Sequence, residues 1–431
     1  MSGNPTTEVL FENVRVFNKT DELSGPTHVL VKGNVIETIS ASPLSVDRSA
    51  NVVQINGNGR TLMPGLIDAH AHIMFAAIPL ALAMTADVGY IHQVAGKAAE
   101  HTLMRGFTAI RDLGGPSFGL KRAIDDGIVS GPRIFPSGAF ISQTSGHGDF
   151  RMLAELPRDP SAPLSYTERI RSSAIADGVD QVLLRTREQL MQGASQVKLM
   201  AGGGVASNYD SLDVTQYNQE EIRAAVGAAE DWGTYVTVHA YTPRAIQRAI
   251  AAGVKCIDHG QLADESTARL MAEKGIWWSL QPFLDDEDAV PFPEGSANRK
   301  KQLQMTSGTD NAYKLAIQYK IKTAWGTDAL FDARLTARQG KQLAKMTRWY
   351  TPAQVLKMAT ADNAELLAMS GPRNPYPGKL GVVGEGALAD LLLVDGDPLA
   401  NLRLIEDPDR SLVVIMKDGK IYKNLLPAKS K

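Results

Sequence analysis

The middle of the chain alternates short apolar runs with longer amphipathic stretches. The runs are rich in β-branched residues, while the stretches between them, such as 220–230 and 243–252, repeat apolar residues at helical spacing. The candidate strands are 66–72, 107–112, 133–137, 196–200, 235–239, 255–259, 276–280 and 322–327. Strands that alternate with helices are typical of parallel βα units. Eight such units predict an α/β fold, the (β/α)8 TIM barrel.

Both ends of the chain instead consist of strand-like segments and turns without helical spacing. The segments are 9–17, 28–39, 388–398 and 411–422. Gly33-Asn34 separates two β-branched runs and predicts a hairpin turn. We therefore predict a small β-sandwich domain formed by residues 1–63 together with 371–431, and a barrel domain of residues 64–370.

The composition of the 431-residue chain narrows the classes of partner. Lys and Arg number 45 against 47 Asp and Glu, a net charge of −2, so neither nucleic acid nor a membrane surface is expected as a partner. No apolar run approaches the ~20 residues that cross a bilayer. The single cysteine, Cys256, excludes an internal disulfide and a cysteine-rich zinc site. Any metal must therefore be bound by histidine, carboxylate or a less usual ligand.

The N-terminal residues have neither the basic start nor the apolar core of a signal peptide. This predicts a cytoplasmic protein. A mature chain from which a leader had been removed would look the same, and it would be periplasmic or secreted.

Candidate chemistry first appears where the run 66–72 ends, at His70-Ala71-His72. Successive side chains of a strand point to opposite faces, so His70 and His72 point the same way and can bind one metal ion. Two hydrogen-bonded structural histidines would give the same pattern. The other strand ends must decide between these interpretations.

Four more strand ends carry residues suited to metal chemistry, namely Lys198, His239, His259 and Asp328. In βα barrels the active site lies at the C-terminal ends of the strands, so these side chains are expected at one rim with the histidine pair. Taken singly, each has a structural interpretation, such as a helix cap at Asp328. Their joint placement at the ends of separate strands favours a functional site.

Lys198 lies between the apolar residues Val197 and Leu199, where an ammonium group is costly to bury. Burial lowers the pKa of a lysine and exposes a nucleophilic amine. Two outcomes are open. Lys198 pairs with a carboxylate as a structural ion pair, or its neutral amine reacts with carbon dioxide to give a carbamate, an anionic ligand that bridges two metal ions.

In this order and on these strands, the ligand-type residues resemble those of the binuclear metal-dependent amidohydrolase superfamily. The segments 63–68 and 384–390, before and after the barrel, are also similar to those enzymes. The segments 137–139 and 143–149 and the tripeptide His239-Ala240-Tyr241 resemble the bacterial prolidase-like metallocarboxypeptidases and their relative ochratoxinase. The resemblance extends over nearly the whole chain.

The resemblance implies two divalent metal ions, most simply Zn²⁺, at the barrel rim. Their ligands would be His70, His72 and Asp328 for one ion, His239 and His259 for the other, and a carboxylated Lys198 between them. The ions would share a hydroxide that attacks the scissile carbonyl, and Asp328 would pass the proton to the leaving amine. His147 and Tyr241 would hydrogen-bond the oxyanion or a substrate carboxylate, unless they only pack the loops. Such ligands also accept Mn, Co or Fe.

The predicted function is zinc-dependent hydrolysis of an amide or peptide bond in a small molecule. The expected substrate is a dipeptide or N-acyl amino acid with a free carboxylate and a small hydrophobic or aromatic C-terminal group, as in ochratoxin-like compounds. A lactone, cyclic-amide or phosphotriester hydrolase would use the same metal pair. A non-catalytic relative is the alternative from another class, although it would be expected to lose ligands. Relatives are commonly oligomeric, which predicts a homo-oligomer.

Two other motifs point to different chemistry. Ser195-Gln196-Val197-Lys198 matches the S-x-x-K pattern of serine acylases, but that chemistry needs a helix, and here Ser195 and Lys198 lie on opposite faces of a predicted strand. Gly202-Gly203-Gly204 lacks the spacing of a nucleotide-binding loop and is expected to be a flexible exit from the strand. The segments 205–219 and 282–311 are expected to wall the pocket.

Overall fold

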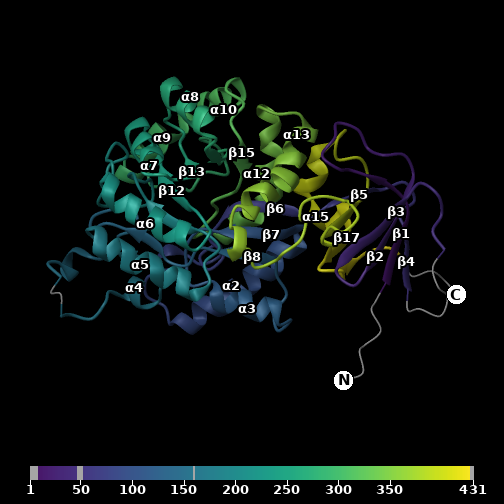
Figure 1. Ribbon diagram of the computed structural model, residues 1–431, viewed down its shortest axis with the longest axis horizontal. Helices are drawn as coiled ribbons and strands as arrows, with labels where there is room; N and C mark the ends of the chain where they lie inside the picture. Colours follow the sequence, from purple (N-terminus) through teal and green to yellow (C-terminus); the bar gives the residue numbers. More distant parts are fainter. Residues whose placement is uncertain (1–7, 46–51, 159–160, 428–431) are drawn as a thin grey trace.

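The computed structural model describes residues 8–45, 52–158 and 161–427. Each of the eight predicted runs contains a strand, and two short strands that the sequence did not predict join them. The strands of this part are β6 (Leu66–Ala71), β7 (Phe107–Asp112), β8 (Arg133–Pro136), β9 (Phe140–Ser142), β10 (Ser173–Ile175), β11 (Val197–Met200), β12 (Val236–Ala240), β13 (Cys256–His259), β14 (Trp277–Leu280) and β15 (Thr323–Trp325). Figure 1 shows them among the helices of the larger part of the molecule.

Helices follow most of these strands. They are α1 (Leu80–Ala83), α2 (Val88–Met104), α3 (Phe118–Asp125), α4 (Tyr166–Arg169), α5 (Val179–Gln192), α6 (Gln219–Asp231), α7 (Pro243–Ala251), α8 (Glu265–Lys274), α9 (Ala297–Thr306), α10 (Thr309–Gln318), α11 (Ala333–Ala337), α12 (Gln339–Ala344), α13 (Pro352–Lys357), α14 (Asn363–Ala368) and α15 (Pro408–Ser411). Shorter helical segments are η1 (Leu153–Glu155), η2 (Lys345–Arg348), η3 (Met358–Asp362), η4 (Gly371–Arg373) and η5 (Leu402–Glu406).

The two helices predicted at 220–230 and 243–252 are confirmed as α6 and α7. The Asn218 side chain accepts from the backbone N–H groups of Glu220 and Glu221 and so caps the start of α6. Pro243 opens α7, where the missing N–H costs nothing. Local sequence therefore sets where these helices begin.

The central strands are parallel, as βα units require. One sheet has the order β10-β9-β11-β12-β13-β14-β15, and a second has the order β6-β7-β8. Backbone hydrogen bonds connect the edges of the two sheets: Ser195 N donates to the Pro136 carbonyl at 2.7 Å, and Asp328 N donates to the His70 carbonyl at 2.8 Å. The strands β9 and β10 have three residues each, too few for a sequence pattern to reveal.

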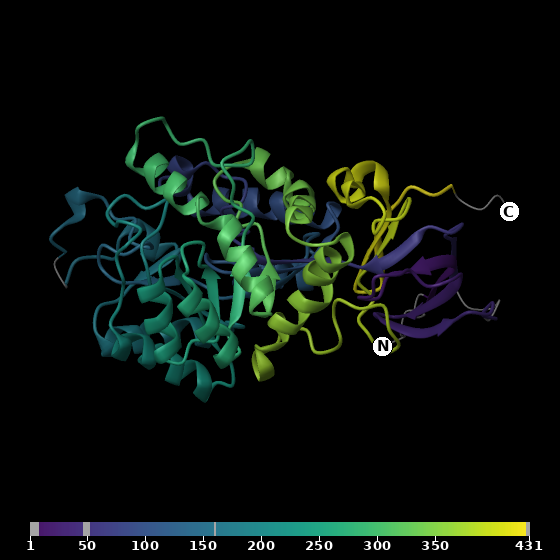
Figure 2. The ribbon, with the colours of Figure 1, turned by 90° about the horizontal axis from the view of Figure 1, so that it is seen from above.

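The two ends of the chain share one eight-stranded sheet. Its strands are β1 (Glu8–Val16), β2 (Thr27–Lys32), β3 (Val35–Ser40), β4 (Val52–Asn56), β5 (Thr61–Pro64), β16 (Leu391–Val394), β17 (Leu412–Lys417) and β18 (Lys420–Asn424). Their order is β18-β17-β16-β5-β1-β2-β3, with β4 beside β1. In both views the N-terminal and C-terminal strands lie together at one end of the molecule (Figure 1 and Figure 2).

The hairpin predicted at Gly33-Asn34 is confirmed, since β2 and β3 pair in antiparallel fashion with Lys32 opposite Val35. A bidentate ion pair connects this sheet to the helical part: Arg133, in β8, binds Asp390 at 2.8 and 3.0 Å. The boundaries at 63/64 and 370/371 stay a prediction, and residues 1–7, 46–51 and 428–431 of the predicted β-domain lie outside the described residues. None of the helices in the described part combines the length and apolar character needed to span a bilayer.

Candidate metal centre

The histidine pair of β6 meets a carboxylate. Asp328 Oδ1 lies 3.3 Å from Nε2 of His70 and 3.1 Å from Nε2 of His72. Both imidazoles thus reach the same oxygen, as strand alternation predicts. The hydrogen bond from Asp328 N to the His70 carbonyl holds the carboxylate beside the pair. Three ligand-type side chains from two strand ends therefore converge.

His259, which ends β13, brings a third imidazole to this place. Ligand atoms of His70, His259 and Asp328 all lie within 4.8 Å of one another. His259 and Asp328 have φ angles of 76° and 49°, in the left-handed region that residues other than glycine rarely adopt. Strained backbone of this kind concentrates at functional sites. The local conformation is therefore consistent with a functional centre.

His239, in β12, is packed between two aromatic side chains. The ring of His147 stacks on it with centroids 4.1 Å apart, and the ring of Tyr241 meets it edge-on at 4.9 Å. His147 comes from the loop after β9, and its Nδ1 lies 2.7 Å from Oγ of Ser207. His239, His147 and Tyr241 line the same cavity as the other ligand candidates. The structure thus brings all the predicted site residues to one cavity.

Each of the four candidate histidines uses one ring nitrogen for a contact with a protein acceptor. The contacts are Nδ1 of His72 with the Gly114 carbonyl at 3.3 Å, Nε2 of His239 with the Gly203 carbonyl at 3.0 Å, Nδ1 of His259 with Oε1 of Gln281 at 2.7 Å, and Nδ1 of His70 with Oδ1 of Asp258 at 3.5 Å. A nitrogen that faces an acceptor carries the proton, so the other nitrogen of His239 and of His259 keeps its lone pair. In His70 and His72 the other nitrogen, Nε2, faces Oδ1 of Asp328, the oxygen with which both would bind a cation. Metal-ligating histidines have this arrangement. The donor set therefore fits a metal centre.

Burial keeps most of these imidazoles neutral. It lowers the pKa of His70 to about 4 and holds the pKa values of His239 and His259 well below the ordinary value. Burial also lowers the pKa of His72, but the contact with the Asp328 carboxylate outweighs burial and raises it. Burial alone would raise the pKa of Asp328, yet the surrounding histidines, His70 foremost, lower it. A carboxylate among neutral imidazoles is suited to bind a divalent cation.

Lys198 forms a buried ion pair beneath the histidines. Its Nζ lies 2.5 Å from Oδ2 of Asp258, and Oδ1 of Asp258 lies 2.7 Å from Nη2 of Arg111. We call Lys198, Asp258 and Arg111 the floor cluster. Burial lowers the pKa of Lys198 despite the opposing charge of Asp258, while the two cations outweigh burial and hold the pKa of Asp258 well below its usual range. Of the two outcomes left open by the sequence, the structure contains the ion pair, and Lys198 also lines the cavity.

Sequence reasoning missed three residues of this centre: Asp258, Arg111 and Gln281. Strand alternation would send Asp258 and His259 to opposite faces, but the positive φ of His259 interrupts the alternation and lets both face the centre. Arg111 is a charged residue inside the apolar strand β7, and that was a usable signal. Gln281 directly follows β14, at the strand ends where the ligand candidates lie, but a glutamine is not among the residue types considered as ligands in the sequence.

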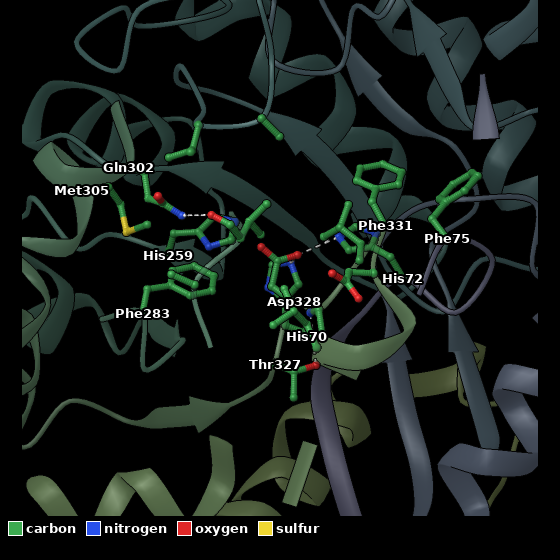
Figure 3. Close-up of a pocket in the computed structure, with 18 of the residues that line it drawn as sticks. His70, His72, Phe75, His259, Phe283, Gln302, Met305, Thr327, Asp328 and Phe331 are labelled. Atoms are coloured by element: carbon green, nitrogen blue, oxygen red, sulfur yellow. Dashed lines mark hydrogen bonds and ion pairs between the residues drawn. The ribbon is translucent and has the colours of Figure 1, made fainter. Parts of the chain in front are cut away.

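The centre opens into a cavity of about 430 Å³ with mostly apolar walls. Figure 3 shows Phe283 and Met305 beside His259 on one side of Asp328, and Phe75 and Phe331 beside His72 on the other. Both segments predicted to wall the pocket contribute, the first through Val205 and Ala206 and the second through residues between Pro282 and Thr306. The cavity therefore has an apolar arm on each side of the candidate ligands.

Ion pairs fasten one wall of the cavity, the segment 282–292, to the helix α12 and its continuation. Lys345 binds Asp286 at 2.6 Å and Asp288 at 2.7 Å, Lys341 binds Glu287 at 2.7 Å, and Arg338 binds both Glu287 and Asp288. We call these six residues the rim cluster. On the opposite side of the segment, the Gln302 side chain donates to the Val290 carbonyl at 2.9 Å.

The glycines after β11 permit a close approach rather than serving only as an exit from the strand. A Cβ atom at Gly204 would lie 1.9 Å from Nδ1 of His147, so only glycine leaves room for that ring. The Gly203 carbonyl is the acceptor for His239. These two contacts account for the glycine run, so a nucleotide-binding loop is not needed to explain it.

Comparison with known proteins agrees with this geometry. The profile of the amidohydrolase family matches residues 61–422. Ochratoxinase from Aspergillus niger is 31% identical over 388 residues, which are 84% of this chain and 75% of that protein. Its crystal structure matches with a TM-score of 0.84 and 25% identity over 98% of this chain and 96% of the other.

Two further crystal structures match nearly the whole chain at higher identity. An amidohydrolase has a TM-score of 0.88 and 34% identity, covering 97% of this chain and 100% of its own. A prolidase complexed with N-methylphosphonate-L-proline has a TM-score of 0.86 and 32% identity with the same coverage.

Proposed function

This chain belongs to the amidohydrolase family, and we propose that it is a metal-dependent hydrolase of dipeptide-like or N-acyl amino acid substrates. Hydrolysis of an amide or peptide bond follows from the family and from its prolidase and ochratoxinase relatives. The observation that carries the metal-dependent part is the set of four buried histidines beside the carboxylate of Asp328, each with one ring nitrogen against an acceptor other than Asp328. A catalytically inert barrel would have no reason to keep that set.

The residues that would hold two divalent ions, most simply Zn²⁺, are His70, His72, His239, His259, Asp328 and a carboxylated Lys198. Carboxylation joins the neutral amine of Lys198 to carbon dioxide and releases one proton. Together with the proton that the ammonium group loses first, this converts a cation into an anionic ligand. When bound, the ions would activate a water molecule and polarise the scissile carbonyl.

The side chains of this protein would perform the proton transfers and bind the substrate. Asp328 accepts the proton of the attacking water and returns it to the leaving amine, because its carboxylate is the anionic base at the centre of the cavity. Tyr241 and His147, which flank His239, hydrogen-bond the oxyanion or the substrate carboxylate. Burial raises the pKa of Tyr241 well above its ordinary value, so its hydroxyl stays a donor.

The substrate carboxylate would be bound by neutral hydrogen-bond donors, because the cavity offers little unpaired positive charge. Among the described residues that line it, the cationic side chains are Lys198 and Lys345. Lys345 is bound to two aspartates of the rim cluster. The apolar arms on both sides of the centre favour a substrate with apolar groups on both sides of the scissile amide (Figure 3).

We also propose the architecture that would support this site. The parallel strands close into a (β/α)8 barrel, supported by the hydrogen bonds from Ser195 to Pro136 and from Asp328 to His70 at the two junctions between the sheets. The terminal strands form a compact β-sandwich-like domain beside it. Cytoplasmic location and a homo-oligomeric state stay predictions.

A substrate panel with defined metal content tests the function. We expect the zinc-loaded protein to hydrolyse N-acyl amino acids or dipeptides with apolar side chains, and to lose most activity when the C-terminal carboxylate is replaced by an amide. Lys198→Ala should lose metal and activity, whereas Lys322→Ala, at an exposed lysine paired with Glu365, should keep both. Full activity in metal-free protein or in Lys198→Ala would contradict the mechanism, and preference for lactones or phosphotriesters would contradict the substrate class.

A further inference from the structure

We propose that Gln281 is a positioning residue that fixes the tautomer of His259 and thereby sets the affinity of the metal ion held by His239 and His259. The inference rests on the proposed function because it presumes a metal at this place. Gln281 follows β14, the strand between those that lead to His259 and Asp328, and its side chain is fully buried. It is itself no ligand candidate, so any influence on a metal ion must pass through its neighbours.

The orientation of the Gln281 amide follows from its hydrogen bonds. Its Nε2 donates to the Ser279 carbonyl at 3.0 Å, and a carbonyl oxygen can only accept. The amide oxygen must therefore face His259, where Oε1 lies 2.7 Å from Nδ1. An acceptor at this distance keeps the proton on Nδ1. The lone pair of His259 then resides on Nε2, the nitrogen left for a metal ion.

The effect is specific to one histidine. Nε2 of Gln281 also lies 3.3 Å from Nδ1 of His70, but an amide nitrogen only donates, so this contact cannot hold a proton on Nδ1 of His70. The acceptor for His70 is Asp258, at 3.5 Å. Gln281 therefore stabilises the metal-binding tautomer of His259 and leaves that of His70 to Asp258.

Gln281 also restricts the rotation of the ring. The backbone of His259 is held in the left-handed region, and its carbonyl accepts from Nε1 of Trp278 at 2.6 Å. With the backbone fixed, the ring can still turn about its side-chain bonds. The bond to Gln281 opposes that rotation, in a place that water does not reach because both side chains are buried.

The other histidines have acceptors that are harder to substitute. His72 and His239 use backbone carbonyls, of Gly114 and Gly203, and His70 uses a carboxylate that also pairs with Lys198 and Arg111. Gln281 is the neutral side chain among these acceptors. It can therefore be replaced without removing a charge from the floor cluster.

The test compares Gln281→Met, which removes the acceptor at nearly constant volume, with Gln281→Glu, which keeps an oxygen facing Nδ1. Zn²⁺ dissociation constants are measured by competition with a chromophoric chelator, and the coordination geometry is followed by the absorption of the Co²⁺-substituted protein. We expect Gln281→Met to weaken one of two metal-binding events by about 10- to 100-fold, the usual cost of losing such a partner, and to leave the other unchanged. Gln281→Glu should bind both ions with affinities close to those of the unsubstituted protein.

Gln261→Met is the matched control. Gln261 is equally buried and donates to the Gln281 backbone carbonyl at 3.2 Å, and no hydrogen bond joins it to a histidine in the described structure. Gln261→Met should lower the melting temperature by about as much as Gln281→Met does. It should keep both metal affinities and the Co²⁺ spectrum of the unsubstituted protein.

Two results would overturn the proposal: unchanged affinity for both ions in folded Gln281→Met, or a tenfold or greater loss in Gln281→Glu. If Gln281→Met does not fold, the second result alone decides. Failure of the unsubstituted protein to bind metal would instead overturn the proposed function, so the two failures are distinguishable.

Discussion

The floor cluster and the rim cluster are both made of ion pairs beside the same cavity, but they differ in burial. In the floor cluster, side chains are at most 1% exposed, and one carboxylate, Asp258, serves two cations. In the rim cluster, Glu287 is 65% and Lys341 37% exposed, and three carboxylates face three cations. Water can replace a lost partner at the rim but not at the floor. Loss of one partner from an ion pair therefore lowers the free energy of unfolding much more in the floor cluster than in the rim cluster.

The second difference concerns function. The floor cluster contacts the histidines, since Asp258 lies beside His70, and it contains Lys198, which would become a metal ligand. The rim cluster instead holds the wall segment that carries apolar side chains over the cavity, and Asp286, Asp288 and Lys345 of this cluster line the cavity themselves. Changes at the floor should therefore alter metal binding and turnover, while changes at the rim should alter stability and substrate affinity.

Removal of the metal should have the largest effect, and this effect should depend on the floor cluster, which contains Lys198, and not on the rim cluster. Dialysis against a chelator is expected to reduce hydrolysis to background and to lower the melting temperature, because a ligand present at about 1,000 times its dissociation constant stabilises the folded state by about 4 kcal/mol. Activity is followed with the substrate found in the panel, and added Zn²⁺ should restore it. If hydrolysis persists in protein shown to be metal-free, the floor cluster has no role in metal-dependent turnover, and the functional difference from the rim cluster is contradicted.

Asp258→Asn should be the most destabilising single substitution in either cluster. In the metal-free protein, where Lys198 is not carboxylated, the substitution leaves Arg111 and Lys198 buried without an anion. Loss of one partner from a buried ion pair costs about 3–5 kcal/mol. Chemical denaturation measures the free energy of unfolding, with Asp286→Asn at the rim as the matched control. Equal stability of the two variants would contradict the importance assigned to burial.

Lys345→Met should have an intermediate effect. Lys345 is 14% exposed and pairs with Asp288, which is 4% exposed, so its loss leaves a carboxylate with only part of its partners. We expect a loss of about 2 kcal/mol of unfolding free energy, typical of a hydrogen bond to a charged group, and a higher KM at nearly constant kcat. A fall in kcat with unchanged KM would show that the rim acts on the chemistry itself.

Lys341→Met should give the smallest effect, because both Lys341 and its partner Glu287 are substantially exposed. The melting temperature is expected to stay within experimental error. Any small difference between Lys341→Met and the unsubstituted protein should shrink further at about 1 M salt, where the Debye length falls to about 3 Å and exposed pairs are screened. A marked loss of stability in Lys341→Met would mean that the rim cluster acts as a cooperative network.

The sequence predicted the elements of the parallel sheet well because each strand is a short apolar run and the helices between them begin at clear signals. Asn218 and Pro243 mark the starts of α6 and α7, and Gly33-Asn34 marks the hairpin. It could not reveal β9 and β10, whose three residues are too short to carry a period. Short elements of this kind depend on the neighbouring strands for their hydrogen bonds.

The same division holds for the candidate site. The sequence by itself determined which ligand-type side chains stand at strand ends, since alternation and strand order follow from local patterns: His70, His72, Lys198, His239, His259 and Asp328. Only the tertiary structure decided which atoms meet. His259 faces the same centre as its neighbour Asp258 because His259 adopts a positive φ, and Gln281 reaches His259 because β13 and β14 are neighbours. Partners of this kind are set by backbone conformation and by contacts between distant segments, which no local pattern encodes.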